Sequence, residues 1–248
     1  MERTELQTHL HELLMVAQYQ DYCPNGLQVE GRSAVSRIVC GVTACQRLLE
    51  LAVAVKADTV IVHHGYFWRG EAEPVVGMKK RRLATLLKND INLFAYHLPL
   101  DAHAKLGNNA QLALAMGWLP QGRFGQQDMG WTGILPQPCT LEQLTGALHT
   151  ELGRMPLSIG EPQQSLRRIA WCTGGGQGFF EQAVAAGADV FVSGEISEQT
   201  THIARETGVA YIAAGHHATE RYGIRALTAY LQQTLGLQAE FMDVDNPA

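Results

Sequence analysis

The sequence predicts an α/β fold with two similar lobes, and three observations support this prediction. Apolar, mostly β-branched runs alternate with segments whose apolar residues recur at helical spacing. A strand–helix–strand pattern found in the first half of the chain occurs again in the second half. Several predicted strands end abruptly in histidine, aspartate or glutamate, at the position where open α/β sheets bind their ligands.

The first half of the chain alternates predicted helices and strands. Thr4 can cap a first helix that continues to about Tyr19, because leucines recur through it at helical spacing. The turn signal Pro24-Asn25-Gly26 ends this segment. Further helices are predicted at residues 44–55, 78–88 and 108–116, and strands at residues 35–42, 58–64 and 91–96.

The second half copies this pattern without a gap. Residues 37–58 align with residues 168–189 at a constant offset of 131 positions. The nine identical positions, numbered in the first copy, are Arg37, Ile38, Gln46, Glu50, Ala52, Val53, Ala54, Ala57 and Asp58. A strand at 209–214 resembles the strand at 91–96. We therefore predict a duplication, with repeats at residues 1–125 and 126–248.

The segment between the two copies has no predicted function. Residues 118–160 are rich in glycine, proline and glutamine and contain no cluster of metal-type ligands. A helix is predicted at residues 141–152, with short strands at 131–135 and 156–159.

Composition restricts the class of protein. The chain has 248 residues. It contains no run of 18 apolar residues without a charge, so the sequence predicts no membrane-spanning helix. Its start lacks the layout of a signal peptide, and five cysteines without a C-x-x-C pair are typical of a reduced, cytoplasmic protein. The net charge of −5 gives no support for nucleic acid as a partner. The one dense basic run, residues 79–82, is interpreted as a solvated helix face, with a nucleic-acid patch as the alternative.

Clusters of histidine and acidic residues follow three predicted strands and suggest a metal site. Imidazole nitrogen and carboxylate oxygen suit hard or borderline divalent ions. His216 and Glu220 are four residues apart at a predicted helix start, so they should share one helical face. His97 and Asp101 have the same spacing, but Leu98-Pro99 is expected to prevent a helix between them. Spacing alone therefore does not show which of the two is a metal ligand. The full candidate set is His63, His64, His97, Asp101, His103, His216, His217 and Glu220.

Two further features have more than one interpretation. The glycine run 174–178 follows a predicted strand and precedes a helix, as phosphate-binding loops do, but it lacks the Walker lysine. We interpret it as a tight strand-to-helix turn. Phe67 and Trp68 beside the histidines could wall a base-binding pocket or serve in packing. No G-x-S-x-G elbow supports a serine hydrolase.

Five separate motifs in this chain resemble the Nif-three-like family, which is also known as the GTP cyclohydrolase I type 2 homologues, and most of all its bacterial YbgI-type members. The motifs are Pro24-Asn-Gly-Leu-Gln28, Val62-His-His-Gly65, His97-x-Pro-x-Asp101, Gly107-x-Asn109 and Gly215-His-x-x-x-Glu220. The resemblance covers essentially the whole chain. It implies two intertwined α/β repeats with mixed β-sheets, a homohexameric ring and a dinuclear metal centre in each subunit.

The resemblance also implies a ligand set. By position, the two metal ions would be bound by His63, His64, Asp101, His216 and Glu220, with the glutamate bridging both ions. It leaves other residues as supports for a ligand or as contacts to a substrate, namely His97, His103, Glu195 and His217. The metals could be zinc, manganese or iron, and the sequence does not rank them.

Two functions fit these expectations. One is a metal-dependent hydrolase of a nucleotide-like or other anionic small molecule, because two divalent ions against Asp101 and Glu220 leave a charge of about +2. In it, Glu220 bridges the metals, and His97 carries a proton or orients Asp101. A competing account makes His97 a packing residue. The other function is a ring-forming regulatory or interaction protein that binds metal without being an enzyme.

Overall fold

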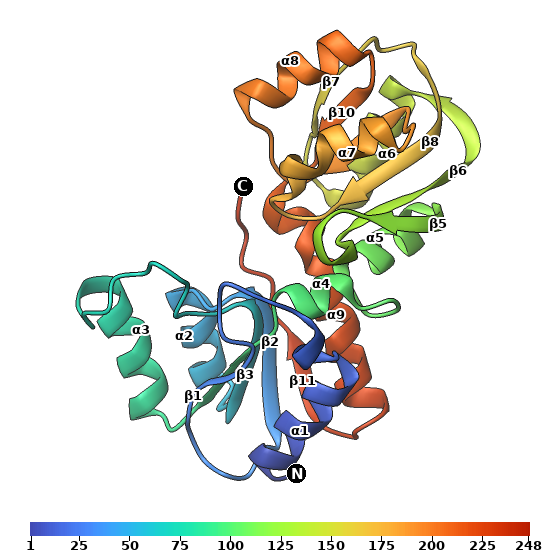
Figure 1. The fold of residues 1–248 in the computed structure, drawn as a ribbon. Helices are drawn as coiled ribbons and strands as arrows, with labels where there is room; N and C mark the ends of the chain where they lie inside the picture. Colours follow the sequence, from blue (N-terminus) through green and yellow to red (C-terminus); the bar gives the residue numbers. More distant parts are fainter. The chain divides into compact units, whose positions relative to one another are not determined.

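The computed structural model describes residues 1–248 and shows a mixed α/β protein with two mixed β-sheets (Figure 1). The predicted fold class is therefore confirmed. The chain forms two compact units, of which the first contains Met1–Gly107 and Gly223–Asp245. The second contains Asn108–Tyr222 and Asn246–Ala248. These units are intertwined along the chain, because the C-terminal segment returns to the first unit. Their bounds differ from the expected repeats 1–125 and 126–248, and that division stays a prediction.

The first unit is built on a five-stranded sheet. Its strand order is β1 (Gly26–Val29), β4 (Asn92–Ala95), β3 (Thr59–His64), β2 (Arg37–Thr43) and β11 (Gln238–Phe241). Only β1 runs antiparallel to its neighbour. The helices of this unit are α1 (Arg3–Leu13), η1 (Val16–Gln18), α2 (Gln46–Ala54), α3 (Gly77–Lys88), α4 (Leu98–Ala102) and the later part of α9 (His216–Gln233).

Helices cover both faces of this sheet. On one face, leucines of α1 and α9 pack with Ile38 and Cys40 of β2. On the opposite face, leucines of α2 and α3 pack with Val39, the strand residue that lies between those two (Figure 1). Successive strand residues point to opposite faces, so a strand covered on both sides must be apolar throughout. This explains why the sequence shows continuous apolar runs rather than alternation.

The second unit is built on a six-stranded sheet. Its strand order is β5 (Leu119–Phe124), β6 (Gly130–Thr140), β8 (Ser165–Cys172), β9 (Val190–Ser193), β10 (Ala210–Ala213) and β7 (Leu157–Ile159). Strands β8, β9 and β10 are parallel, and the outer ones are antiparallel. The helices are α5 (Asn108–Met116), η2 (Gln126–Asp128), α6 (Leu141–Leu152), η3 (Gly176–Phe179), α7 (Phe180–Ala185), α8 (Glu198–Thr207) and the start of α9.

The duplication is visible in the register of the two sheets. Strand pairing joins Ile38 to Thr59 between β2 and β3, and Ile169 to Val190 between β8 and β9, at the offset of 131 positions seen in the sequence. One oxygen of Asp58 accepts hydrogen bonds from the N–H groups of residues 36 and 37, at 2.9 and 2.7 Å. Asp189 accepts the equivalent bonds from residues 167 and 168 at the same distances. Each aspartate thus holds the start of the first strand of its copy.

The first helix differs from the expectation. It ends at Leu13, and Met15 adopts a left-handed conformation with φ of 51° before the short η1. Its N-cap is Glu2 rather than Thr4, because the side chains of Glu2 and Glu5 form a reciprocal capping box with the backbone. The predicted helix at 141–152 is confirmed, and strand β5 was not predicted.

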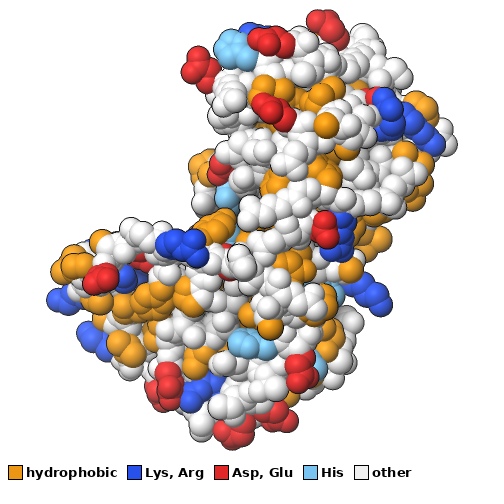
Figure 2. Space-filling model, in the orientation of Figure 1, with side chains coloured by type: hydrophobic (Ala, Val, Ile, Leu, Met, Phe, Trp, Pro, Cys, Tyr) orange, Lys and Arg blue, Asp and Glu red, His pale blue; other side chains and the backbone are white.

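The surface shows no large basic area on the face drawn in Figure 2. Lysine and arginine side chains there lie apart from one another, with aspartate and glutamate among them. None of the helices combines the length and apolar character that crossing a membrane would require.

Candidate metal site

The first group of candidate ligands lies at the end of β3. This strand is parallel to β2 and β4, so the carboxyl ends of all three strands lie at one edge of the sheet. His63 is fully buried, and its Nδ1 lies 3.0 Å from the carbonyl oxygen of Tyr96. Because a carbonyl can only accept, Nδ1 carries the proton and Nε2 carries the lone pair. This is the tautomer that a metal-binding histidine needs.

Asp101 reaches the same edge from α4, and the structure corrects one expectation here. Leu98-Pro99 does not prevent a helix between His97 and Asp101, because α4 begins at Leu98 and places Pro99 in its first turn. Proline is tolerated there, since the first N–H groups of a helix have no acceptor within it. The Asp101 N–H donates to the His97 carbonyl at 3.1 Å. The buried carboxylate then lies 3.5 Å from Nε2 of His63.

Three histidine rings gather beside this carboxylate. The ring centroids of His63 and His64 are 4.5 Å apart, and that of His97 lies 5.1 and 5.6 Å from them. One nitrogen from each ring can be chosen so that all three lie within 4.8 Å of one another. Nδ1 of His64 also lies 3.3 Å from Oγ1 of Thr43, at the end of β2. Three imidazoles and a carboxylate form a donor set that suits zinc, manganese or iron.

His97 is held in place by Asp21. Its Nδ1 lies 2.9 Å from Oδ1 of Asp21, and the other Asp21 oxygen accepts from the N–H of Leu98 and the amide of Asn25. Burial alone would raise the pKa of Asp21, but these hydrogen bonds, with His97 foremost, lower it well below its usual range. The sequence interpretation of this segment as a turn missed Asp21. The only signal was the neighbouring motif that contains Asn25.

Two aromatic rings pack against the same histidine. The centroids of Tyr22 and Trp68 each lie 5.1 Å from that of His97, in edge-to-face contact. The centroid of Trp68 also lies 5.9 Å from that of His64, so Trp68 borders the histidine group. Phe67 instead points its ring toward Nζ of Lys79, at 5.5 Å from the centroid. Trp68 therefore forms part of the wall around the histidines, whereas Phe67 is a more peripheral residue.

The second group of candidate ligands lies at the start of α9 in the second unit. As the spacing predicts, His216 and Glu220 share one helical face, with Nε2 and Oε2 3.0 Å apart. Nδ1 of His216 lies 2.7 Å from Oε1 of Glu195, just beyond the end of β9. Burial alone would lower the pKa of His216, but the two carboxylates raise it to about 9. A histidine between two carboxylates is a site that favours positive charge.

The glycine run shapes the space beside Glu220. It forms a turn and η3 between β8 and α7, which agrees with the interpretation as a tight turn. Gly174 has a φ of 65°, a conformation that favours glycine, and a Cβ at this position would collide with Oε1 of Glu220. The N–H of Gly174 donates to Oγ1 of Thr219, at 3.0 Å. Gly174 therefore allows the backbone to approach the candidate ligand closely.

The remaining sequence candidates have structural contacts. Nδ1 of His103 accepts from the N–H groups of residues 105 and 106, at 3.2 and 2.8 Å, and so caps the turn before α5. The N–H of His217 donates to the carbonyl of Ala248, at 3.1 Å. The structure thus groups His63, His64, His97 and Asp101 in the first unit and Glu195, His216 and Glu220 in the second.

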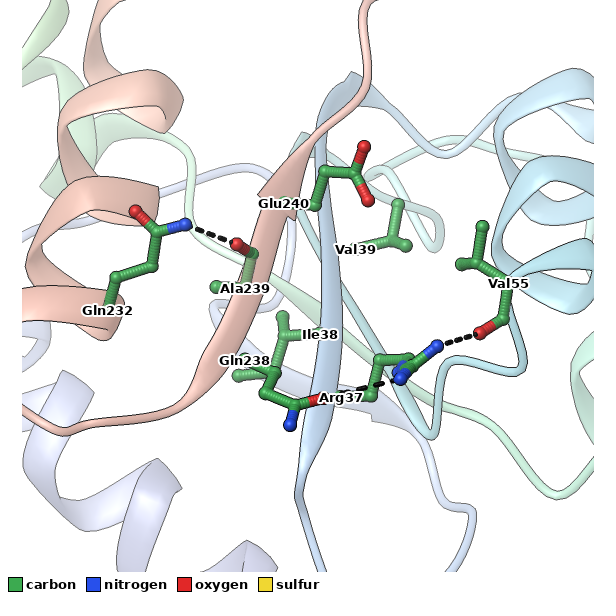
Figure 3. A pocket seen from close by; sticks show the side chains of 8 residues that line it. All are labelled: Arg37, Ile38, Val39, Val55, Gln232, Gln238, Ala239 and Glu240. Atoms are coloured by element: carbon green, nitrogen blue, oxygen red, sulfur yellow. Dashed lines mark hydrogen bonds between the residues drawn. The ribbon is translucent and has the colours of Figure 1, made fainter.

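A cavity of about 430 Å³ in the first unit lies away from the histidines (Figure 3). Its walls include the starts of β2 and β11, whereas His63 and His64 are the last two residues of the parallel strand β3. Arg37 donates to the Val55 carbonyl at 2.8 Å and approaches the Gln238 side chain at 3.4 Å (Figure 3). The guanidinium group of Arg37 therefore bonds to neighbouring residues, and this cavity is not part of the candidate metal site.

Comparison with known proteins identifies relatives along the whole chain. The family model of Duf34/NIF3 (NGG1p interacting factor 3) matches residues 1–247. A protein of Pseudomonas aeruginosa is 54% identical over 95% of this chain and 94% of its own length. A protein of Salmonella typhimurium is 52% identical over the full length of both. Each of these relatives carries the name GTP cyclohydrolase 1 type 2 homolog.

Solved structures agree with this result. The protein ybgI, described as of unknown function, is 52% identical and superposes with a TM-score of 0.97 over 100% of both chains. TTHA1606 from Thermus thermophilus is 36% identical, with a TM-score of 0.91 over 100% of both chains. These two structures therefore share the fold of this chain along its whole length.

Proposed function

The chain belongs to the Duf34/NIF3 family, and we propose that it is a dinuclear metal protein that hydrolyses a nucleotide-like or other anionic small molecule. In this proposal two divalent ions, of zinc, manganese or iron, are held by His63, His64, Asp101, His216 and Glu220. The observation that carries the proposal is that each unit places an imidazole nitrogen against a carboxylate oxygen, at 3.5 Å for His63–Asp101 and 3.0 Å for His216–Glu220.

The electrostatics of the proposed centre define its substrate class. Two divalent ions against the carboxylates of Asp101 and Glu220 leave a charge of about +2, or about +1 with a bridging hydroxide. Such a site favours an anionic or strongly polar substrate. When bound, the ions would lower the pKa of water toward roughly 7 and stabilise the charge that develops during hydrolysis.

The residues of this chain would orient the ligands and move the proton. The Tyr96 carbonyl fixes the His63 ring so that Nε2 can bind an ion. Glu195 does the same for His216 through Nδ1. Asp21 holds Nδ1 of His97, so Nε2 is the atom at which His97 would accept or release a proton. Glu220 would act as the ligand shared by both ions.

Two further properties belong to the same proposal. The resemblance noted in the sequence implies a homohexameric ring, which would make the chain its own partner. The absence of a C-x-x-C pair among the five cysteines is consistent with a cytoplasmic location.

The test combines metal analysis with a substrate screen. Protein loaded with zinc, manganese or iron is analysed for bound metal and assayed against nucleotides and phosphoesters. Glu220→Gln should lose metal from both positions and lose turnover, because it removes a shared carboxylate. Glu206→Gln, on the exposed part of α8, is the matched control and should behave as wild type.

The outcomes separate the alternatives. Equal turnover by wild type and Glu220→Gln would assign the activity to a contaminant. Two bound metals without turnover on any substrate would favour a metal-binding regulatory or interaction protein over an enzyme. One metal or none per chain in carefully loaded protein would contradict the dinuclear centre itself.

A further inference from the structure

A further group of possible metal ligands lies beside the histidines of the first unit. Asp21 and Cys23 come from the loop before β1, and His97 directly precedes α4. One ligand atom from each of these three residues lies within 4.8 Å of the other two. None of the three belongs to the five residues to which we assign the ions of the proposed centre. Cys23 is the only cysteine of the chain that lies in such a group.

The distances within this group resemble the edges of a tetrahedral metal site. Oδ1 of Asp21 lies 2.9 Å from Nδ1 of His97 and 3.7 Å from Sγ of Cys23. Bonds of about 2.0 Å to oxygen or nitrogen and about 2.3 Å to sulfur give tetrahedral edges of about 3.3 Å for O···N and about 3.5 Å for O···S. Small shifts of the side chains therefore suffice to place an ion among these three atoms.

Two donors of this group share one carboxylate oxygen. Nδ1 of His97 donates to Oδ1 of Asp21, because a carboxylate can only accept, and the thiol of Cys23 donates to the same atom. A cation among the three residues would take the place of both donors at that oxygen. The other oxygen of Asp21 would keep its hydrogen bonds from Leu98 and Asn25, so the loop would stay in place.

The group is buried close to the surface of the unit. The side chains of Asp21, Cys23 and His97 are all buried. Tyr22 and Pro24, on either side of Cys23 in the chain, are exposed. A local movement of this loop is therefore enough to admit an ion, and the bound ion would be shielded from water.

The charges of the group suit a divalent ion. With the thiol of Cys23 deprotonated, its thiolate and the carboxylate of Asp21 carry two negative charges, so the complex with a divalent ion is neutral and can be buried at low cost. The thiol proton passes to solvent, and the Nδ1 proton of His97 returns to the ring at Nε2. One proton is therefore released for each ion bound.

The thiol determines which ions are bound. Burial raises the pKa of Cys23, and the neighbouring carboxylate of Asp21 raises it further, so without metal the thiol stays protonated and is a poor nucleophile. A coordinated metal ion deprotonates its thiol ligand. Thiolate sulfur binds zinc and other thiophilic ions, whereas magnesium, calcium and manganese prefer oxygen ligands.

We propose that Asp21, Cys23 and His97 form a separate binding site for one thiophilic divalent ion, such as zinc. The ligand atoms are Oδ1, Sγ and Nδ1, and the site does not depend on the proposed function. Its consequence for catalysis does rest on that function. With the proton held at Nε2, His97 can no longer accept a proton there, so an ion at this site would switch off proton transfer.

The test uses cobalt(II) as the probe. Cobalt bound to a thiolate shows a charge-transfer band in the near ultraviolet, whereas cobalt held only by nitrogen and oxygen does not. The full chain, with its thiols reduced and its metal removed by a chelator, is titrated with excess cobalt. Wild type should develop the band, and added zinc should abolish it by displacing the cobalt.

Three variants assign the band to a residue. Cys23→Ser should lose it, because a hydroxyl can still donate to Asp21 but is not a thiophilic ligand. Cys45→Ser is the matched control and should keep the band, because Cys45 lies in the same unit but in no group of candidate ligands. Glu220→Gln should also keep it, because Glu220 is not one of the three ligands.

A second measurement follows His97 directly. Nitrogen NMR of the imidazole should show the proton at Nδ1 in metal-free protein and at Nε2 after zinc is added. A proton that stays at Nδ1 in zinc-saturated protein would exclude His97 as a ligand and would overturn the site.

The remaining outcomes also decide the proposal. The absence of the band in wild type, or an equal band in Cys23→Ser, would overturn the site. Loss of the band in Glu220→Gln would assign the thiolate to the proposed dinuclear centre and would overturn a separate site. If the five assigned ligands bound no metal and the protein hydrolysed nothing, the proposed function would fail, while the cobalt band would still decide the thiophilic site.

Discussion

Asp21→Asn should destabilise the first unit far more than its small change in volume suggests. The Asp21 side chain is 3% exposed and accepts four hydrogen bonds from N–H groups. Tyr22 and His97 donate to one oxygen, and Asn25 and Leu98 donate to the other. An amide has only one oxygen, so one of these pairs of donors would face another donor at a side chain that is almost fully buried.

The size of the effect follows from those two lost acceptor positions. Leaving a buried donor unsatisfied costs about 1–3 kcal/mol, so two such donors should lower the free energy of unfolding by about 2–6 kcal/mol. The low pKa of Asp21 adds a pH dependence with a defined sign. Its stabilisation should be fully present above the unfolded-state pKa of about 3.9, and should be lost as pH falls through the lower folded-state value.

The assay is urea unfolding of metal-free protein at neutral pH, followed by circular dichroism. Asp90→Asn is the matched control, because it makes the same chemical change at a side chain that is 66% exposed. The ion pair of Asp90 with Arg32 is long, at 4.0 Å, and therefore weak. The control should change the free energy of unfolding by less than about 0.5 kcal/mol. If Asp21→Asn lost no more than Asp90→Asn, the argument that Asp21 anchors His97 and α4 would be refuted.

Three other predictions concern the site and the repeat. Gly174→Ala should reduce metal content, and it should lower the free energy of unfolding by about 1–3 kcal/mol, because the new Cβ meets Glu220 and φ at this position is positive. Gly146→Ala is the control and should change neither quantity. His97→Asn should lower turnover about 10²-fold with metal retained if His97 carries a proton, whereas an unchanged rate would make it a packing residue. Asp58→Ala should lower the free energy of unfolding by about 2–4 kcal/mol, and Asp189→Ala should lower it less, because Asp58 is 6% exposed and the Asp189 side chain is 22% exposed. If thermal unfolding gave the opposite order, the idea that both aspartates hold the first strand of their repeat would be contradicted.

Local patterns in the sequence determined the repeated core of both sheets and part of the site. Continuous apolar runs mark strands that are covered on both faces, and two copies aligned without a gap imply the same strand register. The pair His216–Glu220 was also predictable, because a spacing of four at a helix start puts both side chains on one face. These features depend on residues near one another in the chain.

Only the tertiary structure decided the contacts between distant segments. Asp21 reaches His97 across 76 positions, and β11 pairs with β2, some two hundred residues earlier, which carries the C-terminal segment into the first unit. Pro99 shows the same limit locally, since its effect depends on whether α4 begins before or after it. Spacing and periodicity report on short-range geometry, whereas these arrangements are selected by which buried surfaces and hydrogen-bonding groups satisfy one another across the whole fold.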